Sequence, residues 1–414
     1  MKSPLKLLVA GLATASITAG AVAREGDVPR GVRPLDHLFL IMMENHGYAE
    51  VIGNPDMPFL NHMARHNALA TNYYAVAHPS LTNYLEIVGG SNFGVLNDHS
   101  PDWHNANCQT NLFTGQPSLD ESSYPNICPI GGVGTDAATP AIDNSNLEGN
   151  GPGPVINIDG KAHYAAARTV GKTIAHQLVA AGRSWKAYEE NLPPTGADNV
   201  NSADGFFSNL NPPTTVGITD GLLALYAVKH DPFAYFADVQ EGSDPRLSLK
   251  NVVGFDGSHG LFADLAQGRL PDLIYIVPNQ CNDQHGRSGG GPACDFDPSD
   301  VGTLTGLNPG LMFQGDVTLE RLVTAITASP AWRHGRSAIV VVWDESDYSN
   351  APITNQVTLV VQTNEDDNEG VRSSHFYTHF SLLRSMEAAF NLPCLNHACD
   401  STTEVMSDLF GKDR

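Results

Sequence analysis

Short, continuous apolar runs recur along the chain and alternate with segments of helical periodicity. The clearest runs cover residues 37–43, 273–277 and 338–343. Such runs are typical of strands buried on both faces of a parallel sheet. We predict strands there and over 184–188 and 357–362, with a β-rich segment over 71–77.

Between these runs the apolar positions follow helical spacing. In the last such segment Phe380, Leu383, Glu387 and Phe390 are spaced for one helix face. Arg384 and Glu387 are interpreted as a pair on the helix surface. We predict helices over 59–67, 80–88, 169–181, 258–267, 317–329 and 378–391, while 222–229 and 232–238 stay ambiguous. This alternation predicts an α/β fold: a doubly wound, mostly parallel sheet flanked by helices.

Long polar segments interrupt this pattern. Residues 92–160 are rich in Asn, Gly, Pro and Ser, and residues 286–310 form a glycine-rich loop. Loops of such length are uncommon and are often functional. We expect a single domain over residues 24–414 with a loop-rich insertion at about 92–250.

The N-terminus has the pattern of a secretory signal peptide over residues 1–23. Lys2 and Lys6 precede an apolar, small-residue run, and Ala21-Val22-Ala23 is a suitable cleavage site. A membrane anchor is the alternative, but the run is short and rich in small residues. We expect a secreted or periplasmic protein.

Charge and cysteine content agree with export. The formal net charge is −22, and removal of Lys2 and Lys6 makes it more negative, which disfavours nucleic acid and anionic lipid as partners. An even number of cysteines outside the cytosol predicts three disulfides. Local pairing is our preference, and a zinc–thiolate site is the rival although no CxxC pair occurs. The preferred pairs are Cys108–Cys128, Cys281–Cys294 and Cys394–Cys399.

Acidic residues follow two of the predicted strands directly. Glu44 and Asn45 end the first, and Asp344 and Glu345 end a later one. In doubly wound sheets ligands bind beyond the carboxyl ends of the strands. Carboxylate and amide oxygens are ligands for hard divalent cations, and adjacent buried acids repel one another unless a cation lies beside them. We therefore predict a metal site there.

A hydroxyl lies at the predicted start of the next helix. Ser80 follows His78-Pro79, and the dipole and free amides of a helix N-terminus would receive a phosphoryl group. A bound cation would lower the hydroxyl pKa and make Ser80 both nucleophile and metal ligand. Thr82 is the alternative hydroxyl, and an ordinary N-cap serine is the structural alternative. His78 is placed for a phosphate contact, as is His46 on weaker grounds.

Five motifs in this order resemble those of the phosphoesterase family that includes bacterial acid phosphatases and phosphocholine-type phospholipases C. They cover roughly residues 37–90 and 272–393, and the family belongs to the alkaline-phosphatase-like superfamily. Thr82 stands where such proteins often have proline, and the segment from about 100 to 250 matches nothing recognisable. The motifs are Met43-Glu44-Asn45-His46, residues 78–85, Pro278-Asn279 with Asp283 and His285, Trp343-Asp344-Glu345, and residues 378–384.

The resemblance implies further site residues. Asn83 matches a position that orients a phosphate oxygen, and His379 matches the family's late histidine, with His375 as competitor. Asp283 and His285 would either complete a second metal site with His379 or stabilise the phosphoryl group and protonate the leaving oxygen. The resemblance thus implies one or two divalent cations of undetermined identity.

Together these features predict an exported, metal-dependent phosphoric monoester hydrolase that acts on small phosphate esters through a phosphoseryl intermediate. A phospholipase C-type phosphodiesterase is the alternative, and only then is membrane contact expected. A non-catalytic binding protein on the same scaffold is the third possibility. The oligomeric state is left open.

Overall fold

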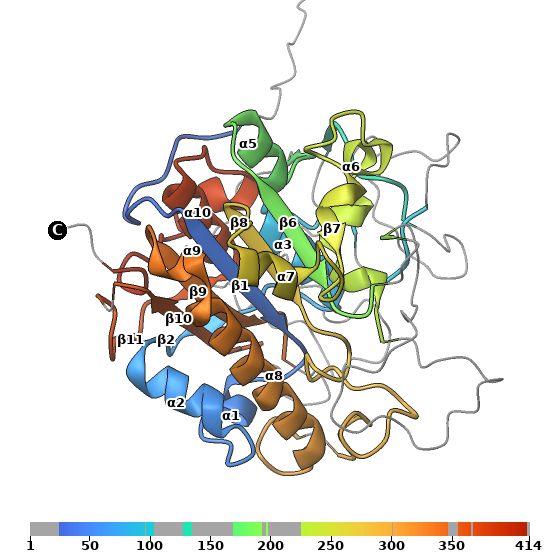
Figure 1. The fold of residues 1–414 in the computed structure, drawn as a ribbon, viewed down its shortest axis with the longest axis vertical. Coiled ribbons are helices and arrows are strands. Elements are labelled where there is room, and N and C mark those ends of the chain that lie inside the picture. The colour runs from blue at the N-terminus through green and yellow to red at the C-terminus, as the bar shows by residue number, and fades with distance from the viewer. Residues whose placement is uncertain are drawn as a thin grey trace, which may run out of the picture.

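The computed structural model describes residues 25–95, 97–102, 127–134, 169–192, 196–197, 225–299, 301–346, 355–365 and 367–411. Within these residues an eight-stranded sheet has the order β11-β2-β10-β9-β1-β8-β6-β7 (Figure 1). Strand β1 (His37–Met43) lies between β8 (Leu273–Val277) and β9 (Ser337–Trp343) and is parallel to both. The predicted α/β fold with a mostly parallel sheet is confirmed.

The other strands extend this centre on both sides. Strand β10 is antiparallel to β9 and β2, whereas β6 is parallel to β8 and β7. Two small sheets pair β3 with β12 and β4 with β5. The bounds are β2 (Ala68–Ala70), β3 (Tyr73–Tyr74), β4 (Val133–Gly134), β5 (Thr169–Val170), β6 (Trp185–Glu189), β7 (Val252–Val253), β10 (Leu359–Thr363), β11 (Arg372–Ser373) and β12 (Tyr377–Thr378).

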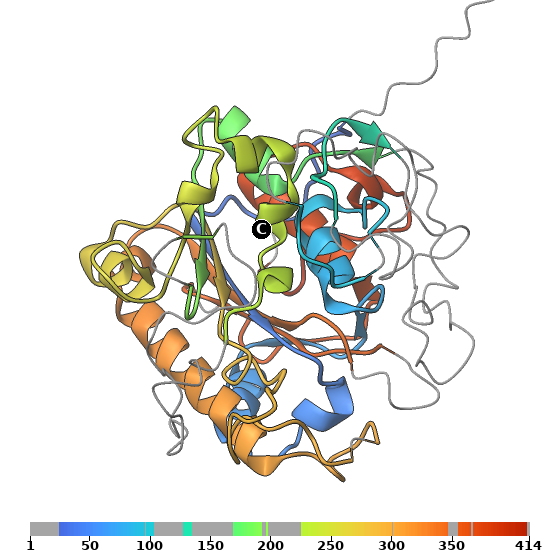
Figure 2. The ribbon, with the colours of Figure 1, turned by 90° about the vertical axis from the view of Figure 1, so that its right-hand side faces the viewer.

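Helices cover both faces of the sheet, as the edge-on view shows (Figure 2). The long helix α8 contacts α2, α7 and α9 on one face, and α10 contacts α3 and α5 on the other. The bounds are α1 (Tyr48–Val51), α2 (Pro58–His66), α3 (Ser80–Gly89), α5 (Ile174–Ala180), α6 (Ala237–Glu241), α7 (Leu261–Gln267), α8 (Pro309–Ala328), α9 (Pro330–Arg333) and α10 (His379–Phe390), with 3-10 helices at Val228–His230, Pro232–Tyr235, Leu249–Asn251 and Asn396–Cys399.

The strands of the centre are buried except for His37 at the start of β1, which explains why their sequences are apolar without alternation. Three expectations for single elements are wrong. The segment 71–77 contains only the two-residue strand β3. Residues 169–170 form a strand, so helix α5 begins at Ile174. Helix α8 begins at Pro309, where Asn308 caps its first turn by accepting from two backbone amides.

Two of the expected disulfides are present, Cys281–Cys294 and Cys394–Cys399. Cys108 lies outside the described residues, so its pairing with Cys128 stays a prediction. The expected signal peptide also lies outside them. Among the described residues no helix combines the length and apolar character needed to cross a membrane. The disulfides favour an extracytoplasmic location.

Candidate active site at the carboxyl ends of the central strands

The parallel register of the central strands brings two acidic strand ends together. Met43 is paired with Trp343 in the ladder between β1 and β9, so Glu44 and Asp344 follow neighbouring strands at the same edge of the sheet. The backbone turns there at Asn45, which has a φ of 53°. Asparagine tolerates this left-handed conformation better than most residues. The amide of Asn45 donates to Asp344 Oδ1 at 3.1 Å.

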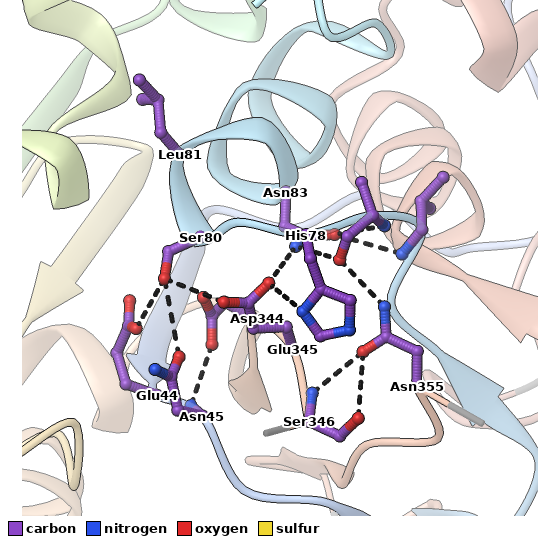
Figure 3. A network of polar contacts seen from close by, with 12 residues as sticks. Glu44, Asn45, His78, Ser80, Leu81, Asn83, Asp344, Glu345, Ser346 and Asn355 are labelled. Atoms are coloured by element: carbon purple, nitrogen blue, oxygen red, sulfur yellow. Dashed lines mark hydrogen bonds and ion pairs between the residues drawn. The ribbon is translucent and has the colours of Figure 1, made fainter. Parts of the chain in front are cut away.

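Ser80 points into this group of polar side chains from the first turn of α3 (Figure 3). Its Oγ lies 3.1 Å from Glu44 Oε2, 3.1 Å from Glu345 Oε1 and 3.5 Å from Asn45 Oδ1. All of these side chains except Asn45 are buried. A hydroxyl enclosed by oxygen ligands has the surroundings that a divalent cation requires.

The start of α3 is fixed by Asp98. The amide of Leu81 donates to Asp98 Oδ1 at 3.0 Å, and Thr82 N donates to the carbonyl of Pro79 at 3.1 Å. These two amides of the first turn, which we expected to be free for a phosphoryl group, therefore already have partners. The other carboxylate oxygen of Asp98 forms an ion pair of 3.0 Å with Lys229 Nζ.

His78 and Asn83 both contact Glu345 rather than Ser80. His78 Nδ1 lies 2.7 Å from Glu345 Oε2, and Asn83 Nδ2 donates to the same oxygen at 3.2 Å (Figure 3). Asn83 also ties down the preceding loop, because its Oδ1 accepts from the amides of Val76 and Ala77. These two residues orient a carboxylate at the site.

Asp283 and His285 lie on the loop after β8, beside Glu44. The amide of Glu44 donates to the carbonyl of Asp283 at 2.8 Å, and Asp283 Oδ1 accepts from the amide of His285 at 2.7 Å. His230, which follows Lys229, lies between them: its Nε2 is 3.2 Å from Glu44 Oε1, and its Nδ1 is 3.5 Å from Asp283 Oδ2. Glu44 therefore contacts Ser80 through Oε2 and His230 through Oε1.

The remaining candidate residues lie around the site with other partners. His379 bonds to the carbonyl of Asp344 at 2.5 Å and to the Tyr73 hydroxyl at 2.8 Å, so both of its ring nitrogens contact protein groups. Elsewhere, His46 pairs with Asp297, Thr82 donates to the carbonyl of Val95, and the exposed His375 pairs with Glu404.

Burial governs the protonation of the acids around Ser80. It raises the pKa of Glu44 to about 7, while Lys229 and the hydroxyl of Tyr84, which donates to Glu44, oppose the rise. Burial, followed by repulsion from Glu44, raises the pKa of Asp344 well above its usual value. Burial also raises the pKa of Asp283 and Glu345. Burial and mutual repulsion therefore disfavour the ionisation of all these acids at once, and an added positive charge would favour it.

The side chains present fit a divalent cation. Asp344 Oδ2 is buried and has no hydrogen-bond partner within the part of the chain that the structure describes. Five residues offer oxygen ligands here: Glu44, Asn45, Ser80, Asp344 and Glu345 (Figure 3). Ligand atoms of Glu44, His230 and His285 also lie within 4.8 Å of one another, so this second group offers a further possible metal site. Carboxylate and hydroxyl oxygens suit hard cations, whereas imidazoles suit transition metals.

Lys229, His230 and Asp98 are site residues that the sequence analysis missed. Lys229 and His230 belong to the short 3-10 helix Val228–His230, in a segment whose periodicity was ambiguous. Asp98 lies in an irregular polar segment. A lysine followed by a histidine directly before Asp231-Pro232 is the one local signal, because Asp-Pro favours a turn and turns often carry functional side chains.

Comparison with known proteins supports the resemblance seen in the motifs. Residues 53–290, more than half of the chain, match the model of the Phosphoesterase family. A phosphatidylinositol-3-phosphatase of Mycobacterium tuberculosis is 22% identical over 413 residues, which cover 98% of this chain and 94% of that protein. An acid phosphatase of Aspergillus fumigatus is 23% identical over 363 residues, or 87% of this chain and 56% of that protein. The chain thus spans just over half of this fungal relative.

Solved structures give more distant likenesses. A protein in the alkaline phosphatase superfamily from Vibrio parahaemolyticus has a TM-score of 0.43 at 12% identity, over 95% of this chain and 72% of that one. The C-terminal periplasmic domain of EcEptC from Escherichia coli, in complex with Zn, has a TM-score of 0.40 at 9% identity, over 95% and 92%.

Proposed function

This chain belongs to the Phosphoesterase family, and from that premise we propose that it hydrolyses phosphoric monoesters with Ser80 as nucleophile. The observation that carries the proposal is the position of Ser80 Oγ, 3.1 Å from both Glu44 and Glu345 at the start of a helix. An ordinary capping serine bonds to the amides of its own helix. Ser80 instead faces carboxylates that come from two other strands.

Glu44, Asn45, Asp344 and Glu345 would hold a divalent cation together with Ser80. When bound, the cation lowers the pKa of the serine hydroxyl and balances the charge of the attacked phosphoryl group. His78 and Asn83 orient Glu345, because both contact its Oε2. His379 supports the end of β9 through the carbonyl of Asp344. Their role is to keep the oxygen ligands in place.

The transfer proceeds in two steps. Ser80 Oγ loses its proton to solvent before it reacts; as the alkoxide it forms a bond to phosphorus while the ester P–O bond breaks, and the leaving oxygen takes a proton from protonated His285 Nε2. Water then attacks the phosphoserine, one water proton returns to His285, and phosphate leaves as the Ser80 alkoxide is regenerated. In-line transfer of this kind depends chiefly on positioning and on stabilisation of charge.

His285 is suited to the proton transfer by its position rather than by its charge in the free protein. Its Nδ1 bonds to the carbonyl of Gly286 at 2.8 Å, so Nε2 faces the site. Burial and then Lys229 lower its pKa to about 3. A bound phosphate dianion brings opposite charge to the ring and raises that pKa. His379 is the weaker candidate because its nitrogens bond to the carbonyl of Asp344 and the hydroxyl of Tyr73, whereas His285 Nε2 contacts Lys229, which also contacts Ser80.

The relatives support a monoester substrate. The curated relatives above are phosphatases, one of them named for a phosphatidylinositol 3-phosphate ester. Release of inorganic phosphate from a monoester is the activity these names have in common. A diesterase would need a second recognition site for the other ester group.

Substitution of Ser80 tests the proposal directly. Ser80→Ala should reduce turnover of p-nitrophenyl phosphate to background, and the wild type, quenched during turnover, should carry phosphate on the peptide that contains Ser80. Thr82→Val is the matched control, since Thr82 is buried on the same helix but donates to the carbonyl of Val95. Full activity of Ser80→Ala, or phosphate on Thr82 instead, would overturn the assignment.

A further inference from the structure

Lys229 brings a positive charge to the nucleophile from outside every recognised motif. Its Nζ donates to Ser80 Oγ at 3.3 Å and approaches His285 Nε2 at 3.2 Å. Its side chain is 16% exposed, whereas that of Glu44 is fully buried. The ammonium group therefore lies beside Ser80 on a side chain that is more exposed than the carboxylate of Glu44.

Asp98 holds Lys229 in this position. One carboxylate oxygen accepts from the amide of Leu81 at 3.0 Å, and the other pairs with Lys229 Nζ at 3.0 Å. The lysine is thereby fixed relative to the first turn of α3, which also carries Ser80. An ammonium group held by a charged partner at a defined distance needs little reorganisation when a substrate binds.

The contact between Asp98 and the helix start also occupies a backbone amide that could otherwise bind an anion. The amide of Leu81 is occupied by Asp98, and that of Thr82 by the carbonyl of Pro79. Two backbone donors of the helix start are thus unavailable to a phosphoryl oxygen. Lys229 is a donor that contacts both the nucleophile and the histidine proposed to protonate the leaving group.

We propose that Lys229 is a catalytic residue that binds a non-bridging oxygen of the transferred phosphoryl group, that Asp98 is its positioning residue, and that this pair selects dianionic monoesters over monoanionic diesters. The inference rests on the function proposed above and extends it to substrate class. A phosphate monoester carries up to two negative charges at neutral pH because its second pKa is about 6. A diester lacks the second charge, so an added cation beside the nucleophile favours the monoester.

The test compares two substrates in the same variants. In Lys229→Met, kcat/KM for p-nitrophenyl phosphate should fall by about 100-fold or more, the usual cost of losing one oxyanion donor. Hydrolysis of bis-p-nitrophenyl phosphate should fall by no more than about 10-fold, since one fewer charge is left unpaired. Inorganic phosphate should also inhibit the variant more weakly. Lys229→Arg should recover part of the monoester preference because it keeps the charge.

Asp98→Asn tests whether Asp98 positions Lys229, while its contact with the start of helix α3 is kept. The amide oxygen can still accept from Leu81 N, but the charged partner of Lys229 is gone. The ratio of monoester to diester kcat/KM should move toward that of Lys229→Met, which a merely structural change would not cause. Lys172→Met is the matched control, because Lys172 is half-exposed and pairs with Glu25; its ratio should equal that of the wild type.

Two results would overturn the inference. Equal losses for both substrates in Lys229→Met would mean that the lysine serves Ser80 or the fold and does not read substrate charge. Unchanged kcat/KM for both substrates would mean that the lysine has no part in catalysis or recognition. Should Lys229→Met fail to fold, Asp98→Asn and Lys229→Arg decide the matter in the same assays. An inactive Ser80→Ala alongside either result would leave the proposed function intact, whereas an active one would remove its basis.

Discussion

Glu44 and Glu387 are both buried glutamates with a raised pKa, but the groups that they contact differ. Glu44 follows β1 and lies among Asp344, Glu345 and Asp283, whereas Glu387 lies in α10 near Arg384 and Glu25. Burial is the main cause of a raised pKa for Glu44 and for Glu387. Desolvation by itself therefore does not distinguish a functional acid from a structural one.

The contacts of the two acids make the distinction. Glu387 Oε1 accepts from the amide of Leu395 at 2.8 Å, so it joins α10 to the segment that follows it. Glu44 instead contacts Ser80, His230 and the hydroxyl of Tyr84, none of which is its neighbour in sequence. Mutual repulsion between acids gathered around a hydroxyl is a cost in stability that a bound cation would remove.

The largest effect is expected from neutralising one of the acids around Ser80. Asp344→Asn should lower kcat/KM for p-nitrophenyl phosphate on the order of 1,000-fold, because several kcal/mol of transition-state stabilisation depend on the cation. In chelator-treated protein the same change should raise stability by on the order of 1 kcal/mol, since it relieves repulsion from Glu44 and Glu345. Enzyme assays and thermal unfolding of the chelated proteins measure both effects.

Gln240→Ala is the control, because Gln240 is a buried polar residue that donates to the carbonyl of Ala234 rather than to the groups around Ser80. Activity there should stay within about twofold of the wild type, as for most substitutions remote from the chemistry. If chelated Asp344→Asn is less stable than the chelated wild type, the idea of an electrostatically costly cluster is wrong.

Metal removal should have the next largest effect. Dialysis against a chelator should abolish turnover, and return of a divalent cation should restore it and stabilise the fold by about 2.7 kcal/mol at a free concentration of 100 times Kd. Elemental analysis gives the identity and number of bound ions, and loss of an ion in Asp344→Asn would assign that ion to the oxygen-rich group rather than to the second group with His230 and His285. Full activity in protein free of metal would contradict the ligand role of Glu44 and Asp344.

Sequence patterns predicted the part of this site that follows from the sheet. Glu44 and Asp344 end apolar strands, and parallel pairing of β1 with β9 necessarily brings such ends together. Ser80 was recognisable because Pro79 marks a helix start. Lys229 was not, because it lies in a 3-10 turn whose position depends on long-range contacts such as that with Asp98.

Helix α8 and Glu387 illustrate two further limits of prediction from the sequence. Asn308-Pro309 is a helix-start signal, but the glycine-rich segment before it hid the first turns of α8. Glu387 was interpreted as a surface partner of Arg384, although its spacing matched the buried face, and the structure shows that interpretation to be wrong. Arg384 instead donates to the carbonyls of Ala398 and Asp400. Periodicity identified the buried face correctly, and residue type alone was the misleading signal.

The smallest predicted effect concerns Glu387, and it tests how this glutamate differs from the acids around Ser80. Burial raises its folded pKa well above the usual value, so the folded state favours the neutral acid. As the pH rises above about 4.5, the unfolded chain ionises first, and wild-type stability is lost until the folded pKa is reached. Glu387→Gln cannot ionise, so it should match the wild type below that pH and exceed it at neutral pH, by on the order of 1 kcal/mol.

Chemical denaturation at a series of pH values from 4 to 8 measures this gap, with p-nitrophenyl phosphate turnover recorded in parallel. Glu365→Gln serves as the control for loss of a partly exposed glutamate, because Glu365 pairs with Arg33 and Arg336. Activity of Glu387→Gln should remain near that of the wild type, in contrast to Asp344→Asn, because the side chain of Glu387 bonds to the backbone of Leu395 and not to the groups around Ser80. A stability gap that is constant with pH would show that Glu387 is ionised in the folded protein, and the likeness between the two acidic environments would then be lost.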